Sequence, residues 1–319
     1  MAKGLLSNPI FHDADKAREW LEARLWKAGR ICPHCGVIDQ STLMQGKTTR
    51  PGLYQCNACR EPFTVTVGTL YERSKIPLNK WLAATQLLMS SKKGMSALQI
   101  GRLLGISPKS SWFVCHRIRE SLRETNPGLL GGSNKVVEAD ETYVGGKAKN
   151  RKNHVPSKEV VFSLVERDGK VRSKHVPNVT GKTLGAAIKA QMDPASYLMT
   201  DDAPMYPPLA KKLASGHGSV NHSAEEYVRG TFWHTNTIEG YFSIMKRGIT
   251  GVYHHVSPQH LKRYLAEFDY LYNERSGLDV DDALRMEKSI PGIVGKRLTY
   301  RRTREYGDAV LGDRKAPQA

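Results

Sequence analysis

The sequence predicts a mixed α/β fold class with more than one structural unit. The chain has 319 residues, more than the ~100 to 200 of a typical domain, so two or three compact units are expected. Hydrophobic residues make up 39% and charged residues 25%, which is typical of a folded chain and too interrupted by charge for a membrane span. A cysteine-rich stretch and helical patterns occupy the first half, and strand and helix patterns alternate in the second. Fibrous, disordered and membrane-spanning classes are therefore excluded.

The charge of the chain predicts a polyanionic partner. Lys and Arg total 48 against 31 Asp and Glu, which gives a formal net charge of +17. Such a chain carries positive potential over much of its surface. The first 20 residues contain no apolar run followed by a small-residue cleavage site, so we expect no secretory signal and a reducing, cytoplasmic location.

Residues 1–30 are predicted to form an amphipathic helical segment. Its apolar residues recur at steps of three and four, which is the helical period. They are Ala17, Trp20, Leu21, Leu25 and Trp26.

Residues 31–72 are predicted to form a zinc ribbon of short strands, of which 64–71 (TVTVGTLY) is the clearest. Two C-x2-C pairs, with 20 residues between the inner cysteines, indicate a metal site rather than disulfides in a reducing compartment. The predicted ligands are Cys32, Cys35, Cys56 and Cys59. Four thiolates complete a zinc tetrahedron and leave no open position, so the zinc is expected to be structural.

Residues 73–125 are predicted to hold a helix-turn-helix DNA-binding region. Helical patterns cover 78–92 and 95–123, and the second is interrupted at Gly105 and restarted by Pro108. The basic second helix would enter the major groove. The side chains expected to contact phosphates and base edges are Ser110, Ser111, His116, Arg117 and Arg119.

A Gly-rich linker is predicted at 126–135, followed by a domain over 136–285 and a loosely held basic tail over 286–319. Asp168-Gly169 between two alternating runs predicts a β-hairpin. The strands are expected at 136–144, 160–166, 170–176 and 196–200, and the main helices after Thr180, at 236–246 and at 258–273.

Three acids of the second half predict a site for two divalent cations. Asp140 lies within a β-branched strand, Asp201 ends an apolar strand, and Glu239 lies in a helical run. A carboxylate inside an apolar strand needs a partner such as a metal ion. Hard cations take oxygen ligands, and one carboxylate can bridge two ions. Asp202 follows Asp201 directly and is an alternative second ligand.

The helix at 236–246 is predicted to direct several polar groups to one place. Steps of three, four and three residues put Asn236, Glu239, Ser243 and Lys246 on one face. Lys246 would hold a phosphate. A basic loop before the hairpin is expected to grip phosphates through Lys147, Lys149, Arg151 and Lys152, with a solvated loop as the alternative.

The chain resembles the zinc-ribbon DDE transposases of bacterial insertion sequences, whose catalytic domain is RNase H-like. The resemblance covers roughly residues 15–280 and is carried by CPHC…CNAC, VEADETYVGGK, the LMTDD strand end, HTNTIEGYFSIMKRGITGVYHHVS and LAEFDYLYNER. It implies that Asp140, Asp201 and Glu239 are the three catalytic acids and Lys246 the accompanying base. Asn236 is an alternative ligand.

The resemblance also implies an activity and partners. A Mg²⁺- or Mn²⁺-dependent enzyme would cut DNA at the transposon ends and join the freed 3′-hydroxyl to target DNA. The expected partners are duplex DNA, as terminal inverted repeats and target, and further copies of the chain in a synaptic complex associated with the bacterial nucleoid. Two alternatives remain: a non-catalytic DNA-binding regulator and a nuclease without strand transfer.

Overall fold

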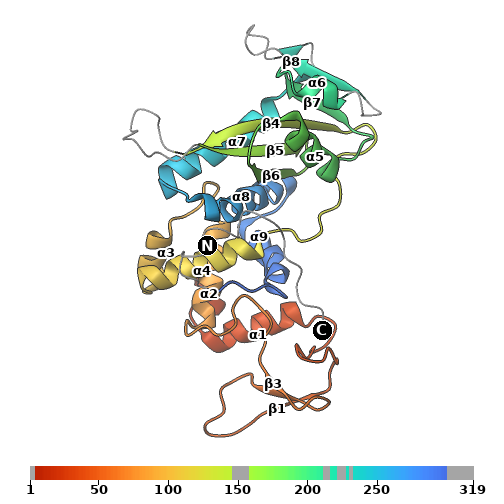
Figure 1. Cartoon of the computed structure of the whole chain (residues 1–319). Helices are drawn as coiled ribbons and strands as arrows, with labels where there is room; N and C mark the ends of the chain where they lie inside the picture. The colour runs from red at the N-terminus through yellow and green to blue at the C-terminus, as the bar shows by residue number, and fades with distance from the viewer. Residues whose placement is uncertain (1–3, 146–157, 211–215, 221–227, 230–232, 300–319) are drawn as a thin grey trace.

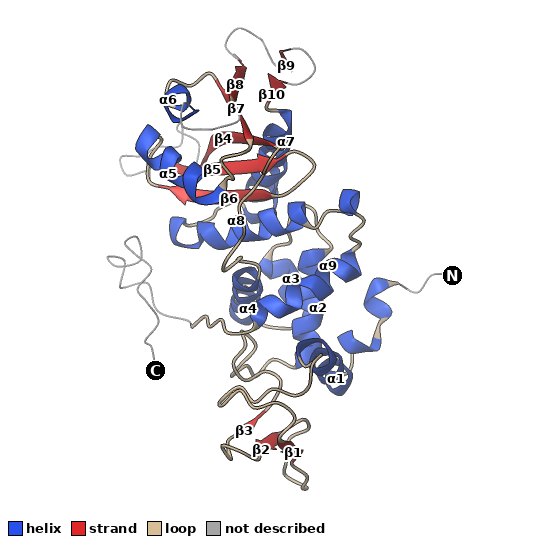
Figure 2. Cartoon of the chain, turned by 90° about the vertical axis from the view of Figure 1, so that its right-hand side faces the viewer, coloured by secondary structure: helices blue, strands red, loops and turns tan. Residues whose placement is uncertain are grey.

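A computed structural model describes residues 4–145, 158–210, 216–220, 228–229 and 233–299. A small ribbon, a helical body and a sheet with flanking helices follow one another along the long axis of the molecule (Figures 1 and 2). In the part of the chain that the structure describes, no helix has the length and apolar character needed to cross a membrane.

The first helix and the ribbon share an aromatic contact. Helix α1 (Ala14–Leu25) begins at Asp13, whose side chain accepts hydrogen bonds from two backbone N–H groups of the first turn. The ribbon pairs β1 (Ser41–Leu43), β2 (Tyr54–Cys56) and β3 (Pro62–Phe63) in an antiparallel sheet. Trp26, just after α1, packs edge-on against Tyr54 and Phe63.

The strand predicted at 64–71 is wrong. This stretch forms turns, with Gly68 at φ +74°. Val65, Leu70 and Tyr71 are buried in the core of the helical body, so the apolar residues that suggested a strand anchor a compact turn to helices instead.

The helical body contains α2 (Leu78–Met89), α3 (Ala97–Leu104), α4 (Pro108–Ser121) and α9 (Asp282–Ser289). The predicted break between α3 and α4 is confirmed, because Gly105 is left-handed at φ 60°. Ser107 then caps α4 by accepting a hydrogen bond from the Ser110 N–H, and Pro108 occupies its first turn.

The end of the described chain returns to this helical body. Met286, Ile290 and Ile293 are buried in the same core as Trp81 of α2 and Ile118 of α4. Apolar burial therefore holds residues 286–293, the start of the predicted basic tail, against the helical body. Residues 300–319 lie outside the described part of the chain.

The second half is built on a five-stranded sheet in the order β6-β5-β4-β7-β8. Strands β4 (Val136–Val144), β5 (Glu159–Glu166) and β6 (Val171–Val176) are antiparallel neighbours, and β5 and β6 form the predicted hairpin. Strands β7 (Tyr197–Asp201) and β8 (His217–Val220) run parallel to β4. Each predicted strand of this domain is present.

Helices cover both faces of the sheet. Helix α5 (Gly181–Gln191) packs on one face through Leu184 and Ile188. Helices α7 (Asn236–Gly248) and α8 (Pro258–Asn273) cover the other face (Figure 1). The remaining elements are α6 (Tyr206–Ala210) and the short paired strands β9 (Val228–Arg229) and β10 (Trp233–His234).

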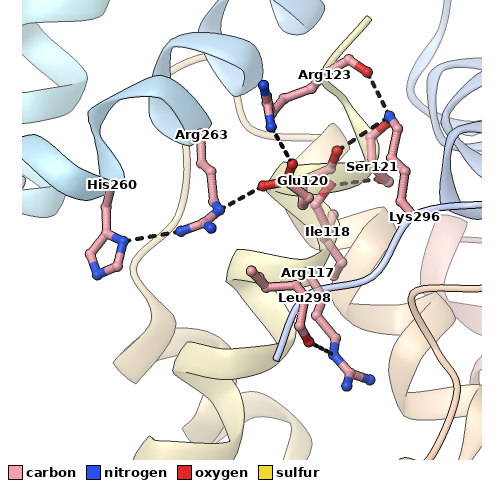
Figure 3. A network of polar contacts seen from close by, with 9 residues as sticks. All are labelled: Arg117, Ile118, Glu120, Ser121, Arg123, His260, Arg263, Lys296 and Leu298. Atoms are coloured by element: carbon pink, nitrogen blue, oxygen red, sulfur yellow. Dashed lines mark hydrogen bonds and ion pairs between the residues drawn. The ribbon is translucent and has the colours of Figure 1, made fainter. Parts of the chain in front are cut away.

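The junction between α4 and α8 joins the two halves through buried charges. The Arg119 guanidinium donates to the Glu267 carboxylate at 2.6 Å, and both side chains are almost fully buried. Next to this pair, Glu120 accepts hydrogen bonds from Arg263 of α8 and from Arg123 (Figure 3). The helical body and the sheet domain are therefore in direct polar contact.

Candidate active site and metal centre

The sheet register brings the first two predicted acids side by side. Strands β4 and β7 pair in parallel with Glu138 opposite Met199. Continuing this register by two residues places Asp140 level with Asp201 at the carboxyl end of β7. Asp140 lies on the sheet face covered by α7, because it shares this face with Glu138 and Thr142 at alternate positions.

Neighbouring charges indicate that the three acids lie near one another. Burial raises the pKa of Asp140 to about 7, and the charges of Glu141, Asp201 and Glu239 act in the same direction. Glu239 therefore lies near Asp140 although the two are far apart in the chain. Asp201, rather than the exposed Asp202, is the aspartate of β7 that acts on the pKa values of Asp140 and Glu141.

Helix α7 has the polar face that its spacing predicts. Asn236, Glu239 and Lys246 are exposed along it, and Ser243 is half-buried and accepts hydrogen bonds from Arg247. The opposite face packs into the core through Ile238, Tyr241, Phe242 and Met245. The face of α7 thus leaves Glu239 and Lys246 accessible to a charged substrate.

Glu138 fixes the start of α7, a role that the sequence analysis missed. Its carboxylate is fully buried and accepts four hydrogen bonds: from the Thr237 N–H and hydroxyl, from the Ile238 N–H and from the Arg167 guanidinium. A carboxylate at a helix N-terminus satisfies N–H groups that have no partner within the helix. The residue that follows Ile238 is Glu239, so Glu138 ties the third acid to the strand that bears the first. The sequence signal that could have revealed this role was an acidic residue within the apolar run VVEAD.

A fourth carboxylate, Glu141, was also missed. Its Oε2 accepts a hydrogen bond from the Tyr206 hydroxyl of α6 at 2.6 Å. Burial raises the pKa of Glu141, and the charge of Asp201 adds to the effect. The candidate site is thus richer in carboxylates than the three acids alone.

The cysteine ligands are assembled more tightly than the acids. The Sγ atoms of the four predicted cysteines lie within 4.8 Å of one another, with Cys32 and Cys59 at 3.7 Å and Cys35 and Cys56 at 3.6 Å. A tetrahedron with Zn–S of ~2.3 Å separates the sulfur atoms by about 3.8 Å, so the four thiols fit one zinc ion. Among the described residues, only these four side chains gather closely enough to hold a metal ion as they stand.

The pKa values of the cysteines and the position of His34 agree with this site. Backbone N–H groups of Cys59 and Ala58 lower the pKa of the Cys56 thiol to about 6, which favours the thiolate that zinc binds. His34 is exposed and lies outside the cluster. Cys115 is fully buried in the helical core, as its apolar surroundings predict.

Comparison with known proteins divides the chain in the same way. Residues 12–61 match the transposase zinc-ribbon domain, and residues 129–273 match the ISXO2-like transposase domain. A relative described as an uncharacterized protein in transposable element ISH50 of Halobacterium salinarum is 26% identical over 262 residues, 76% of this chain and 85% of the relative. The chain therefore contains regions that match the zinc-ribbon and transposase domains of insertion sequences.

The transposase domain match begins just before β4 and ends with α8, so it contains all four carboxylates and Lys246. The zinc-ribbon match contains α1 and all four cysteines. Helices α2, α3 and α4 lie between the two matched ranges. The predicted DNA-reading helix therefore falls in the part of the chain that neither match describes.

The structure contradicts part of the predicted DNA contact on α4. Ser111, His116 and Arg119 are buried: Ser111 donates to the Ala97 carbonyl, and Arg119 pairs with Glu267. His116 lies between the rings of Trp112 and His260, and burial lowers its pKa to about 2. Ser111 thus joins α4 to α3, His116 and Arg119 belong to the α4–α8 junction, and none of the three faces solvent.

The other two residues of α4 that were predicted to contact DNA, Arg117 and Ser110, are only partly buried. Arg117 is half-buried and donates to the carbonyls of Leu70, Glu72 and Leu298, so its guanidinium holds the loops around α4 together (Figure 3). Ser110, in the first turn of α4, is partly exposed and interacts with Ser107. The predicted contacts of the basic loop, Lys147, Lys149, Arg151 and Lys152, lie outside the described residues.

Proposed function

We propose that this protein is a DNA transposase that cleaves transposon ends and transfers the freed strand to target DNA. The observation that carries the proposal is the register of β4 and β7, which when continued by two residues places Asp140 level with Asp201, with Glu239 near enough to raise the pKa of Asp140. Perturbed carboxylates gathered on one edge of a fold are typical of catalytic sites. The match to the transposase domain supports the same conclusion.

The sheet topology supports an RNase H-like catalytic domain. Three antiparallel strands are followed by two strands parallel to the first, with helices on both faces. The acids lie on the central strand β4 and its parallel neighbour β7, and the third acid comes from a helix that packs on the same face. Strands and a rigid helix, rather than loops, therefore hold the site.

The donor set fits divalent cations, although the carboxylates do not converge to ligand distance in the described structure. The charges of Glu141, Asp201 and Glu239 oppose the ionisation of Asp140, and this cost is removed when a cation shares the site. Mg²⁺ or Mn²⁺ held there would activate the attacking oxygen and stabilise the leaving oxygen during in-line displacement. Asp140, Asp201 and Glu239 would hold the ions, and the exposed Lys246 would bind a phosphate near them.

The bonds change in two steps. In the first, a water oxygen forms a bond to phosphorus at the transposon end, and the bond from phosphorus to the 3′-oxygen breaks. In the second, the released 3′-hydroxyl forms a bond to a target phosphorus and displaces a second 3′-oxygen, which takes a proton. Neither step requires a covalent bond to the protein. Joining two ends calls for more than one copy of the chain, so we expect a homo-oligomer during the reaction.

A labelled terminal-repeat duplex incubated with the protein, target DNA and Mg²⁺ tests this proposal. Joined products support a transposase, cleavage alone supports a nuclease, and binding alone supports a regulator. The variant Asp140→Asn should yield neither cleavage nor joining while still shifting the duplex in a gel. The matched control Asp202→Asn, an exposed neighbour of Asp201, should react like the wild type. Cleavage by Asp140→Asn at the wild-type rate would remove Asp140 from the site.

A further inference from the structure

A large cleft lies between the two halves, away from the candidate acid site. It has a volume of about 980 Å³ and is lined by the end of α4 with the chain after it, by β6, by α8 and by the segment that follows α9. Asp140, Asp201 and Glu239 are not among its lining residues. Neither the acid site nor the zinc ribbon accounts for this cleft.

The lining of the cleft is strongly basic. Seven of the residues that line it are Lys or Arg, and three are Asp or Glu. Some of the cations are already engaged: Lys288 pairs with Glu274 at 2.6 Å and Arg172 with Glu124 at 3.4 Å. The Lys296 ammonium donates to three backbone carbonyls at the end of α4, as Figure 3 shows. These contacts hold the walls of the cleft.

Each acid of the cleft already has another partner. Glu124 and Glu274 are the partners just named. Asp269 accepts hydrogen bonds from Ser173 and Tyr241, and burial raises its pKa to about 6, so it is directed into the protein. Lys170, Lys174 and Lys262 are exposed along the same cleft. The cleft therefore presents positive charge to whatever enters it.

Strand β6, at the edge of the sheet, and the residue before it place three cationic residues in a row. Residues 170, 172 and 174 are all cationic and stand at alternate positions, so they share one side at steps of about 6.6 Å. Sheet register also relates this strand to the acids, because Ser173 is opposite Ser163, which is opposite Asp140. Residues 170, 172 and 174 alternate with Ser173, so their side chains lie on the opposite face of the sheet from Asp140.

We propose that this cleft binds the phosphate backbone of duplex DNA, at a site distinct from the one where strands are cut. The inference rests on the proposed function, because it takes DNA as the substrate. A linear array of cations fits a polymer with regularly spaced phosphates better than a single small anion. Contacts of this kind fix the position of a duplex without selecting its sequence.

The salt dependence of DNA binding tests the cleft. The variant Lys170→Gln/Lys174→Gln removes two exposed charges from β6, and the matched control Lys182→Gln/Lys189→Gln removes two exposed charges from α5, outside the cleft. Binding of a fluorescein-labelled duplex of about 30 base pairs is followed by anisotropy across a salt series. Each lost phosphate contact lowers the slope of log Kd against log salt by about 0.9, so the cleft variant should lose about 2 in slope and the control none.

The outcomes separate this proposal from the proposed function. A cleft variant with the same slope as the control overturns the cleft proposal, and so does a wild-type protein that does not bind the duplex. The cleavage assay with Asp140→Asn is independent of both. If Asp140→Asn is inactive and the cleft variant keeps its slope, the catalytic proposal stands and the cleft proposal falls. If the slope falls as expected but Asp140→Asn still cleaves, the reverse holds.

Discussion

Asp140 occupies a position where ionisation opposes folding. Its carboxyl is largely buried among Glu141, Asp201 and Glu239, and its pKa rises to about 7. Because the folded-state pKa lies above the unfolded value, the ionised carboxylate destabilises the folded state increasingly as the pH rises from about 4 to about 7. A residue that lowers stability in this way is expected at a site selected for chemistry.

The variant Asp140→Asn should therefore stabilise the protein while abolishing cleavage. At pH 8, without added magnesium or manganese, we expect a gain of about 2 kcal/mol in the free energy of unfolding, and near pH 4 little or no gain. Urea denaturation at several pH values measures this difference. Asp202→Asn, at an exposed position just after β7, is the matched control. An equal gain at every pH would show that charge is not the cause.

Glu138 has the opposite character, although it lies two residues before Asp140 on the same face. Its four hydrogen bonds match the lone pairs of a buried carboxylate, and the Arg167 guanidinium at 2.7 Å balances its charge. Strand β4 thus carries two different acids. Glu138 has a full set of hydrogen-bond partners and positions α7, whereas Asp140, two residues further on, has fewer partners. The difference lies in the partners that the fold supplies and could not be predicted from residue type.

Replacing Glu138 tests this positioning role. Glu138→Ala leaves the Arg167 guanidinium and the first turn of α7 without their acceptor, and we expect a loss of about 3 to 5 kcal/mol in the free energy of unfolding. Glu138→Gln keeps an acceptor and should lose less. Hydrogen exchange should rise first in the amides of Thr237 and Ile238. A control, Glu61→Ala in the exposed part of the ribbon, should change stability by less than about 0.5 kcal/mol.

At the scale of elements, local patterns predicted much of the second half. The strand at 136–144, the Asp-Gly hairpin, the capped helix after Thr180 and the polar face of α7 depend on neighbours in sequence, and the structure has each of them. The prediction of a strand at 64–71 was wrong because an alternation of apolar residues is also compatible with a buried turn. The DNA contacts predicted for α4 are wrong in part for a different reason. Its basic residues indicated a DNA-binding surface, but α8, which is remote in sequence, covers the side of α4 that bears Arg119 and Glu120.

The zinc ribbon is the element that depends most on its ligand. Its own core consists of Cys32, Tyr54, Cys56 and Phe63, which is too small to hold a fold without metal. We expect Cys56→Ser to lose the bound zinc, measured by metal analysis, and to increase hydrogen exchange over residues 31–63. Strands β4 to β6 should keep their protection, because their core is separate. Cys115→Ser, at a buried cysteine away from the cluster, should retain zinc.

Across the whole molecule, buried polar contacts at the α4–α8 junction couple the helical body to the sheet domain. The Glu267 carboxylate accepts from Arg119 and from the Tyr253 hydroxyl, and the Arg119 guanidinium also lies over the rings of Tyr253 and Tyr264. Tyr253 is the last residue of a short π-helical segment, Ile249–Tyr253, which follows α7. A displacement of α4 would therefore be transmitted to the helix that bears Glu239.

A double-mutant cycle measures this coupling. Arg119→Met or Glu267→Met alone leaves one buried charge without its partner and should lower the free energy of unfolding by about 3 to 5 kcal/mol. The combined variant should recover at least half of the summed loss, because no unpaired charge remains. Chemical denaturation followed by circular dichroism provides the values. Strictly additive losses would mean that the two side chains do not stabilise each other.

The burial of Met286, Ile290 and Ile293 against α2 and α4 has a consequence for how the protein is made. The ribosome releases the N-terminal helices long before it synthesises these three residues, so the first core stays incomplete until the segment after α9 has been made. A premature stop codon after α8 would leave every catalytic acid in place and yet give a product with an open apolar surface, which proteases and chaperones recognise. Such truncated chains would thus be cleared rather than accumulate.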